Sequence, residues 1–205
     1  MTENEYNLKY WLFYIQLERE FCETLNYVEF SDDNFKTYSK AYAKQLISIG
    51  SELDIILKKL CQYVDSSKPR KNIKDYANIL CNYDELIDAE VCFSFNRKLY
   101  KPFSNWTPDS SPSWWRAYNK IKHHRAEKEN IKQANLKNVF YALTALFVLN
   151  RYLCKIVCAD KIVQEPEIKS NLFAMAGWNI CISEGNGFTK VISPEGNMQI
   201  VFENE

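Results

Sequence analysis

The chain has 205 residues, enough for one domain with a sizeable core, and its 26 Lys and Arg balance 26 Asp and Glu. This balance excludes a global electrostatic field that would draw the whole protein onto nucleic acid or a membrane, so any such binding has to be local. Seven cysteines without a CxxC pair and a polar, acidic first segment (MTENEYNLKY) predict reduced thiols, no signal peptide and a cytoplasmic location.

Helical patterns fill the first two-thirds of the chain, where Gly50 is the single glycine before residue 177. A first helix is predicted over about 5–27. From Phe35 to Leu60, apolar residues recur with a mean spacing near 3.6 residues. This spacing predicts one long helix, with the segment SDDN as its cap and Gly50–Ser51 as the place for a bend. A third helix is predicted from near Lys71.

A β-hairpin is predicted at 91–103 (VCFSFNRKLYKPF). The stretch KPFSNWTPDSSPS that follows holds three of the six prolines and four serines, which is typical of a loop. Ser111 followed by Pro112 predicts the start of a helix, with the serine as its cap. One face of that helix is apolar and is expected to pack on the core: Trp114, Tyr118 and Ile121.

The segment from about 133 to 160 is apolar on several sides, which predicts a helix in the middle of a bundle. Polar residues interrupt its most apolar run at Asn150, Arg151 and Lys155, so a buried helix is favoured over a membrane span. Four side chains are predicted to be almost inaccessible to solvent: Val139, Leu143, Leu146 and Phe147.

The last 29 residues hold four of the five glycines and three stretches of alternating apolar residues, separated by EGNG and PEGN. This pattern predicts a small three-stranded antiparallel meander over 177–203. The predicted fold class is therefore mainly α: a bundle of about five helices over residues 1–165, with a small C-terminal antiparallel β meander as an appendage.

The polar face of the helix that starts at Pro112 holds the residues of chemical interest. Arg116 and His123 are seven residues apart, two helical turns, and Asn119 lies between them. A guanidinium, an amide and an imidazole are thus expected on one outward face. Basic and histidine side chains surround them in the same short stretch: Lys120, Lys122, His124 and Arg125.

Arg116, six intervening residues and His123 resemble the Arg-x(4–6)-His motif of HEPN (higher eukaryotes and prokaryotes nucleotide-binding) domains. The sequence pattern WW-x-x-YN-x-x-KHHR, followed by ANLKNVFYALTALFVL, is similar to sequences of HEPN-like proteins of bacteria and mobile elements. The resemblance covers residues 5–160 as architecture and 114–149 as recognisable sequence. It implies a helical bundle of the kind found in toxin–antitoxin, abortive-infection and CRISPR-associated systems.

The resemblance also implies a metal-independent endoribonuclease without a cofactor, whose two motif copies face each other in a homodimer. In that case His123 acts as general acid or base, Arg116 stabilises charge on the phosphate, and Asn119 orients the imidazole or holds the phosphate. The surrounding side chains would bind the RNA backbone: Lys120, Lys122, His124 and Arg125. An antitoxin or other protein partner is a further expectation.

Two other interpretations remain open. A polar helix face of this composition is most often simply solvated, and many HEPN domains bind or dimerise without cutting RNA. The family usually places a polar residue directly after the arginine, whereas this chain has Ala117, which favours a non-catalytic interaction module using the same face. No metal site is expected, because adjacent histidines on a helix cannot readily chelate one ion and no cysteine pair lies nearby.

Overall fold

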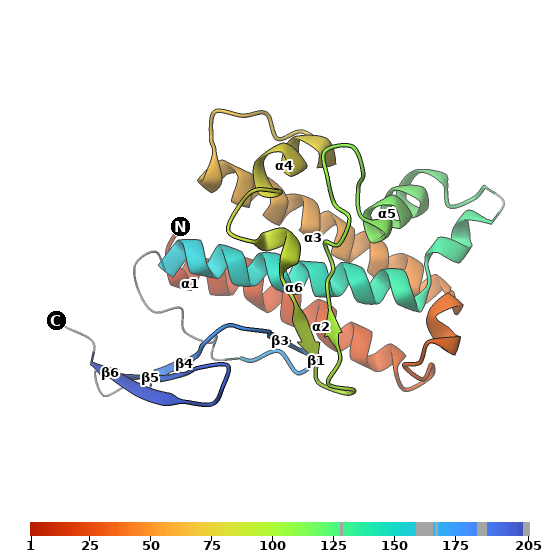
Figure 1. The fold of residues 1–205 in the computed structure, drawn as a ribbon. Coiled ribbons are helices and arrows are strands. Elements are labelled where there is room, and N and C mark those ends of the chain that lie inside the picture. Colours follow the sequence, from red (N-terminus) through yellow and green to blue (C-terminus); the bar gives the residue numbers. More distant parts are fainter. Residues whose placement is uncertain (128, 159–165, 167, 184–187, 203–205) are drawn as a thin grey trace.

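A computed structural model describes residues 1–127, 129–158, 166, 168–183 and 188–202. The apolar segment after residue 135 forms helix α6 (Leu136–Cys158), which lies in the middle of the helical bundle (Figure 1). It packs most extensively against α3 and also contacts α1, α2 and α5. The fold is mainly α with a C-terminal antiparallel meander, as predicted from the sequence, and it has a second small antiparallel sheet built on the predicted hairpin.

Helix α6 is covered by protein on almost every side. Of its 23 residues, 18 are buried, so the helix forms the centre of the core rather than one wall of it. Its length and composition would suffice to cross a membrane, but 83% of its most apolar window is buried inside the bundle. The four side chains predicted to be inaccessible are confirmed as such: Val139, Leu143, Leu146 and Phe147, at 0–3% exposed.

The first predicted helix is present as three consecutive segments. An α-helical turn, α1 (Glu3–Tyr6), is followed by a π-helical segment, η1 (Asn7–Trp11), and then by α2 (Leu12–Thr24). The Thr2 side chain and Glu5 form a capping box at its start, which satisfies amide groups that the first turn leaves free. The helix therefore starts and ends slightly earlier than the predicted range of 5–27.

The long helix α3 (Lys40–Val64) begins later than its apolar pattern predicts. Its cap is Ser39, whose hydroxyl accepts a hydrogen bond from the Tyr42 amide at 3.0 Å. The segment SDDN is not the cap, because it leads into a separate 3₁₀ turn, η2 (Asp33–Lys36), that contains Phe35. The apolar spacing continues through η2, so spacing alone could not show where the helix starts.

Gly50 does not interrupt α3. It is buried, and a Cβ atom at this position would lie 2.2 Å from Cδ2 of Tyr118 on helix α5 (Ser113–His124). The glycine is therefore required for the close approach of two helices rather than as a break in one. This contact fixes the position of α5, the helix that carries the candidate site.

Helix α4 (Ile73–Leu80) is capped by Asn72, whose side chain accepts hydrogen bonds from the amides of Lys74 and Asp75. Two further 3₁₀ turns follow along the chain, η3 (Leu86–Asp88) and η4 (Asn130–Gln133). Because η4 ends just before α6, the helix predicted from about residue 133 begins at Leu136 instead.

The predicted hairpin at 91–103 is confirmed as strands β1 (Val91–Phe93) and β2 (Leu99–Tyr100). The sequence did not predict its third strand, β3 (Phe173–Met175), which pairs with β1 to give the order β2-β1-β3. Residues between the two predicted units thus join a sheet packed on the bundle. The short apolar run around Phe173 gave no sign of this partner.

The C-terminal meander is also confirmed, with β4 (Ile180–Ser183), β5 (Phe188–Ile192) and β6 (Met198–Phe202) pairing in chain order. It lies beside the bundle, away from α5 (Figure 1). Three parts of the predictions lie outside the described residues: the turn at 184–187, the domain boundary near 165, and the last two residues of the helix predicted over 133–160.

Candidate functional site

Helix α5 (Ser113–His124) has one face in the core and one face outside. Trp114, Tyr118 and Ile121 are 1–3% exposed, which confirms the predicted inner face. Arg116 and His123 are both exposed, and Asn119 is half-buried at the border of the two faces. The amphipathic pattern of the sequence therefore predicted the outward direction of Arg116 and His123 correctly, whereas Asn119, predicted on the same outward face, is partly buried.

The start of α5 differs from the predicted capping by Ser111. Pro112 occupies the cap position, where its side chain makes no capping hydrogen bond, and the helix begins at Ser113. The carbonyl of Ser111 instead accepts a hydrogen bond from the guanidinium of Arg116. This contact turns the Arg116 side chain back toward the start of the helix, away from His123.

Arg116 lines a cavity of about 210 Å³ at this end of α5. Two lysines share the cavity with it: Lys101 from the loop after β2, and Lys137 from the first turn of α6. Small polar side chains supply much of the remaining wall: Ser104, Asn105, Ser110, Ser111 and Ser113. Pro102, Trp114 and Tyr141 add the apolar part. The described lining residues include no Asp or Glu, so the cavity is cationic.

The loop that forms the outer wall is held in place by its aromatic residues. The indole N–H of Trp114 donates a hydrogen bond to the carbonyl of Pro102 at 2.8 Å, inside the protein. Phe103 and Trp106 are buried, with ring centroids 5.4 Å apart. Burial of these rings anchors the loop from below, so the cavity has a defined shape before any ligand binds.

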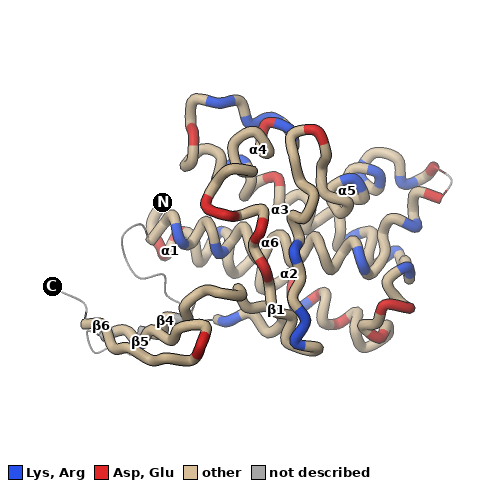
Figure 2. The backbone as a smooth tube through the Cα atoms, in the orientation of Figure 1, with Lys and Arg blue, Asp and Glu red and all other residues tan. Residues whose placement is uncertain are grey.

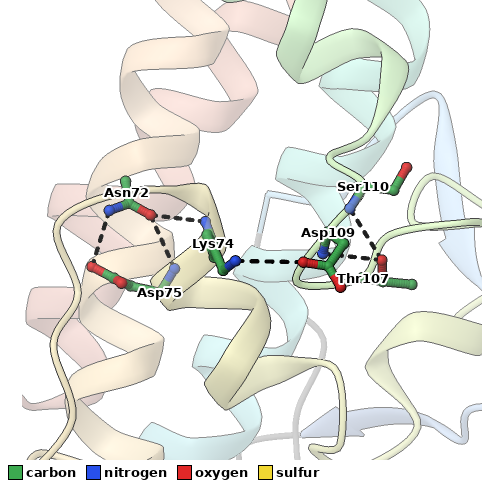
Figure 3. Close-up of polar contacts among 6 residues, drawn as sticks. All are labelled: Asn72, Lys74, Asp75, Thr107, Asp109 and Ser110. Carbon is green, nitrogen blue, oxygen red and sulfur yellow. Dashed lines mark hydrogen bonds and ion pairs between the residues drawn. The ribbon is translucent and has the colours of Figure 1, made fainter.

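A turn at Thr107–Ser110 ties the far end of this loop to α4. The Thr107 hydroxyl accepts hydrogen bonds from the amides of Asp109 and Ser110, and Lys74 contacts the Asp109 carboxylate at 3.4 Å (Figure 3). Because that ion pair is exposed, it adds little to stability. It does place a carboxylate beside α4 rather than beside the cavity.

Two groups next to the cavity influence its charge. Glu90 forms an exposed ion pair with Lys101 at 3.2 Å, which offsets part of that lysine's charge. Burial raises the pKa of the Tyr141 hydroxyl, and electrostatic interactions with Tyr100 and Asp32 raise it further. Tyr141 therefore stays a neutral phenol at physiological pH and contributes no negative charge to the cavity.

The C-terminal half of α5 is different in character. His123 is exposed and points away from the core, whereas the Nδ1 atom of His124 lies 2.6 Å from the Glu127 carboxylate. Lys122 lies over the ring of Tyr118, 5.4 Å from its centroid. Lys120 and Arg125 are exposed on the same stretch, where Figure 2 shows Lys and Arg along α5 and acids in the following loop.

The structure thus separates the two ends of the predicted motif. Arg116 and His123 are two turns apart, about 10 Å along the helix axis, and His123 is not among the residues that line the cavity. Among the described contacts, no hydrogen bond links Arg116, Asn119 or His123 to one another. Ala117 is buried at 1% exposed, so the position after the arginine faces the core in this chain.

Lys101 and Lys137 are the charged cavity residues that sequence reasoning missed. Neither lies in the motif, and each is an ordinary exposed lysine when viewed in its own segment. The tertiary fold brings them to Arg116. No group of three His, Cys, Asp or Glu side chains suited to a metal ion occurs in the part of the chain that the structure describes.

Comparisons with known proteins leave this geometry as the main guide to function. A scan against protein-family models, a search of curated proteins and a search of solved structures each returned no match.

Proposed function

We propose that this protein is a HEPN-like, metal-independent endoribonuclease or RNA-binding effector that acts in the cytoplasm, as a toxin or phage-defence protein. One observation carries the proposal: Arg116, Asn119 and His123 lie on the outward or border face of a helix whose other face is buried. That helix is the α-helix before the buried core helix α6, the arrangement that the motif's resemblance implies.

The proposed reaction needs no cofactor, because RNA carries its own nucleophile. An imidazole of His123 removes the proton from a ribose 2′-hydroxyl, whose oxygen attacks the adjacent phosphorus. The bond from phosphorus to the 5′-oxygen breaks, and a second imidazole protonates that leaving oxygen. The products are a 2′,3′-cyclic phosphate and a 5′-hydroxyl. Arg116 stabilises the negative charge on the phosphate oxygens.

A homodimer would supply the second imidazole. Within one copy the guanidinium of Arg116 is turned away from His123, so one copy presents an incomplete site. A two-fold axis beside the end of α5 would place the two His123 side chains opposite each other. Exposed cations on α5 would then bind the RNA backbone: Lys120, Lys122 and Arg125. Because Nδ1 of His124 already contacts the Glu127 carboxylate, we assign this histidine only a minor role in RNA binding.

A non-catalytic module that dimerises or binds an antitoxin or another protein is the second candidate. The burial of Ala117 favours it, since the position where the family carries a polar side chain cannot contact a substrate here. The separation of Arg116 from His123 favours it as well. In this alternative the same face of α5 contacts a partner protein.

An assay of RNA cleavage by purified protein in EDTA distinguishes the endoribonuclease from the non-catalytic module. We expect single-stranded RNA to be cut with a 2′,3′-cyclic phosphate or its 3′-phosphate product, and DNA to survive because it lacks the 2′-hydroxyl. His123→Ala should lose activity by about 10²–10⁴-fold, the usual contribution of positioned acid–base catalysis. Arg116→Ala should also be severely impaired, and His124→Ala only mildly.

Arg19→Ala is the matched control, because Arg19 is exposed on α2 and removal of its guanidinium leaves the site intact. Equal cleavage by wild type and His123→Ala would rule out the proposed chemistry. Light scattering should report a dimer at micromolar concentration. A monomer, or intact RNA with a dimeric wild type, would favour the non-catalytic module.

A further inference from the structure

The cavity at the N-terminal end of α5 has the chemistry of a phosphate site. Three cationic side chains line it, Lys101, Arg116 and Lys137, together with four serine residues. The described lining residues carry no carboxylate. A phosphate group favours this combination, because its oxygens accept several charge-assisted hydrogen bonds at once.

Arg116 is held ready for such a ligand without being neutralised. One of its terminal nitrogens donates to the carbonyl of Ser111, which is an uncharged acceptor. A guanidinium has five N–H donors, so the others stay available to phosphate oxygens. The carbonyl thus fixes the direction of the charge while leaving its full strength at the cavity.

The start of α5 adds to this environment. Its cap position is Pro112, which makes no side-chain capping hydrogen bond, and Ser113 and Trp114 from the first turn line the cavity. Uncapped amide groups at the start of a twelve-residue helix favour an anion. These amides add to the attraction that the three cationic side chains exert on an anion, and they would not define a site by themselves.

The walls do not have to form around the ligand. Trp114 is buried and bonded to Pro102, and Phe103 and Trp106 beneath the loop are buried as well. Little conformational entropy of the loop is therefore lost when a ligand enters. The cavity, at about 210 Å³, is small and suits one phosphate with part of its sugar rather than an extended strand.

We propose that this cavity binds a phosphate group of single-stranded RNA through Lys101, Arg116 and Lys137, and so sets where the strand lies relative to His123. The choice of RNA as the ligand rests on the function proposed above, whereas the phosphate chemistry rests on the cavity itself. The phosphate is either one inside the strand or a terminal 5′-phosphate. Lys101 and Lys137 are binding residues in this proposal and take no part in proton transfer.

The test uses a fluorescent 2′-O-methyl RNA decamer, which cannot be cleaved because its nucleophile is blocked. Binding is measured by anisotropy at several salt concentrations in EDTA. We expect Lys101→Ala and Lys137→Ala each to weaken binding about five- to twentyfold. Each should also reduce the slope of log affinity against log salt by about 0.7, the value for one phosphate contact on a single strand.

Lys9→Ala is the matched control. Lys9 is exposed and ion-paired with Glu5, much as Lys101 is with Glu90. Lys9 lies toward the other end of α6 from the cavity. The hydroxyl of Tyr6, three residues before Lys9, donates a hydrogen bond to the carbonyl of Asn150 in the second half of α6, whereas the cavity residue Lys137 lies in the first turn of that helix. This variant should bind like wild type. A decamer with a 5′-phosphate and one with a 5′-hydroxyl distinguish the two phosphates: a stronger effect of the variants on the former assigns the terminal group.

The outcomes separate this proposal from the catalytic one. If Lys101→Ala and Lys137→Ala bind the decamer like wild type, or if wild type does not bind it, the phosphate site is wrong, even when unmodified RNA is cleaved. If both variants weaken binding while wild type leaves unmodified RNA intact, the phosphate site stands and the endoribonuclease does not. Circular dichroism should show all variants folded, since both lysines are exposed.

Discussion

The centre of the bundle and the C-terminal sheet are both rich in apolar residues, yet they bury them very differently. Most of α6 is buried, whereas all five residues of the edge strand β6 are exposed. Met198, Ile200 and Phe202 are 52–72% exposed. The difference shows that burial depends on how many neighbours cover an element: α6 is surrounded by helices, whereas β6 pairs with β5 alone among the described strands.

The largest expected effect in this comparison comes from Leu143→Ala. Leu143 is fully buried in α6, so its truncation removes apolar contacts and leaves a cavity. We expect the free energy of unfolding to fall by about 2–5 kcal/mol, measured by urea denaturation. A loss below about 1 kcal/mol would mean that the core around α6 is loosely packed.

Glu18→Ala should break the connection between the bundle and the segment that leads to the sheet. Glu18 is 1% exposed and accepts hydrogen bonds from the hydroxyls of Tyr14 and Ser170 and from the amide of Asn171 at 2.7 Å. We expect a loss of about 2–3 kcal/mol, because three buried or partly buried donors lose their carboxyl acceptor.

Hydrogen exchange provides the specific readout for Glu18→Ala. Protection should fall most in residues 168–175, which include β3. Glu20→Ala, an exposed carboxylate on the same helix, is the control and should change neither stability nor exchange there. An unaltered exchange pattern in Glu18→Ala would contradict the anchoring role.

Gly50→Ala tests the tight contact between α3 and α5. Alanine favours a helix by about 1 kcal/mol over glycine, but its Cβ would overlap the Tyr118 ring at 2.2 Å. We expect the overlap to prevail and stability to fall by about 1–3 kcal/mol in urea denaturation. Ser51→Ala, exposed on the same helix, should change stability little. A stabilised Gly50→Ala protein would show that α5 can shift away without loss.

The smallest expected effect is that of Ile200→Ser in β6. Because this side chain is 52% exposed, its replacement should change the free energy of unfolding by no more than about 0.5 kcal/mol. Urea denaturation at two protein concentrations provides the measurement. A loss above about 2 kcal/mol that depends on concentration would show that β6 is buried against another copy.

Periodic signals explain what the sequence could predict. The apolar spacing on α3, the apolar sides of α6 and the alternation in β4–β6 each depend on local residues, so those elements were predicted. The start of α3 at Lys40, after its cap Ser39, was missed because the apolar spacing continues back through η2 to Phe35. The second partner of β1 was missed because pairing with β3 depends on residues about eighty positions away.

Dependence on residues distant in the chain also limited how much of the candidate site could be predicted. The outward direction of Arg116 and His123 follows from helical periodicity and was predicted. The turn of Arg116 toward Ser111 and the approach of Lys101 and Lys137 depend on the loop after β2 and on the packing of α5 against α6. No spacing within one segment encodes these contacts.

The pairing of β1 with β3 has a consequence for the order in which the protein folds during synthesis. Val91 pairs with Met175, so β1 lacks one neighbour until most of the chain has left the ribosome. The helices before residue 158 can pack earlier because their contacts do not require β3. Until then β1 offers an open strand edge that could pair with another nascent chain. A protein shortened before residue 173 should therefore aggregate more readily than the 205-residue chain.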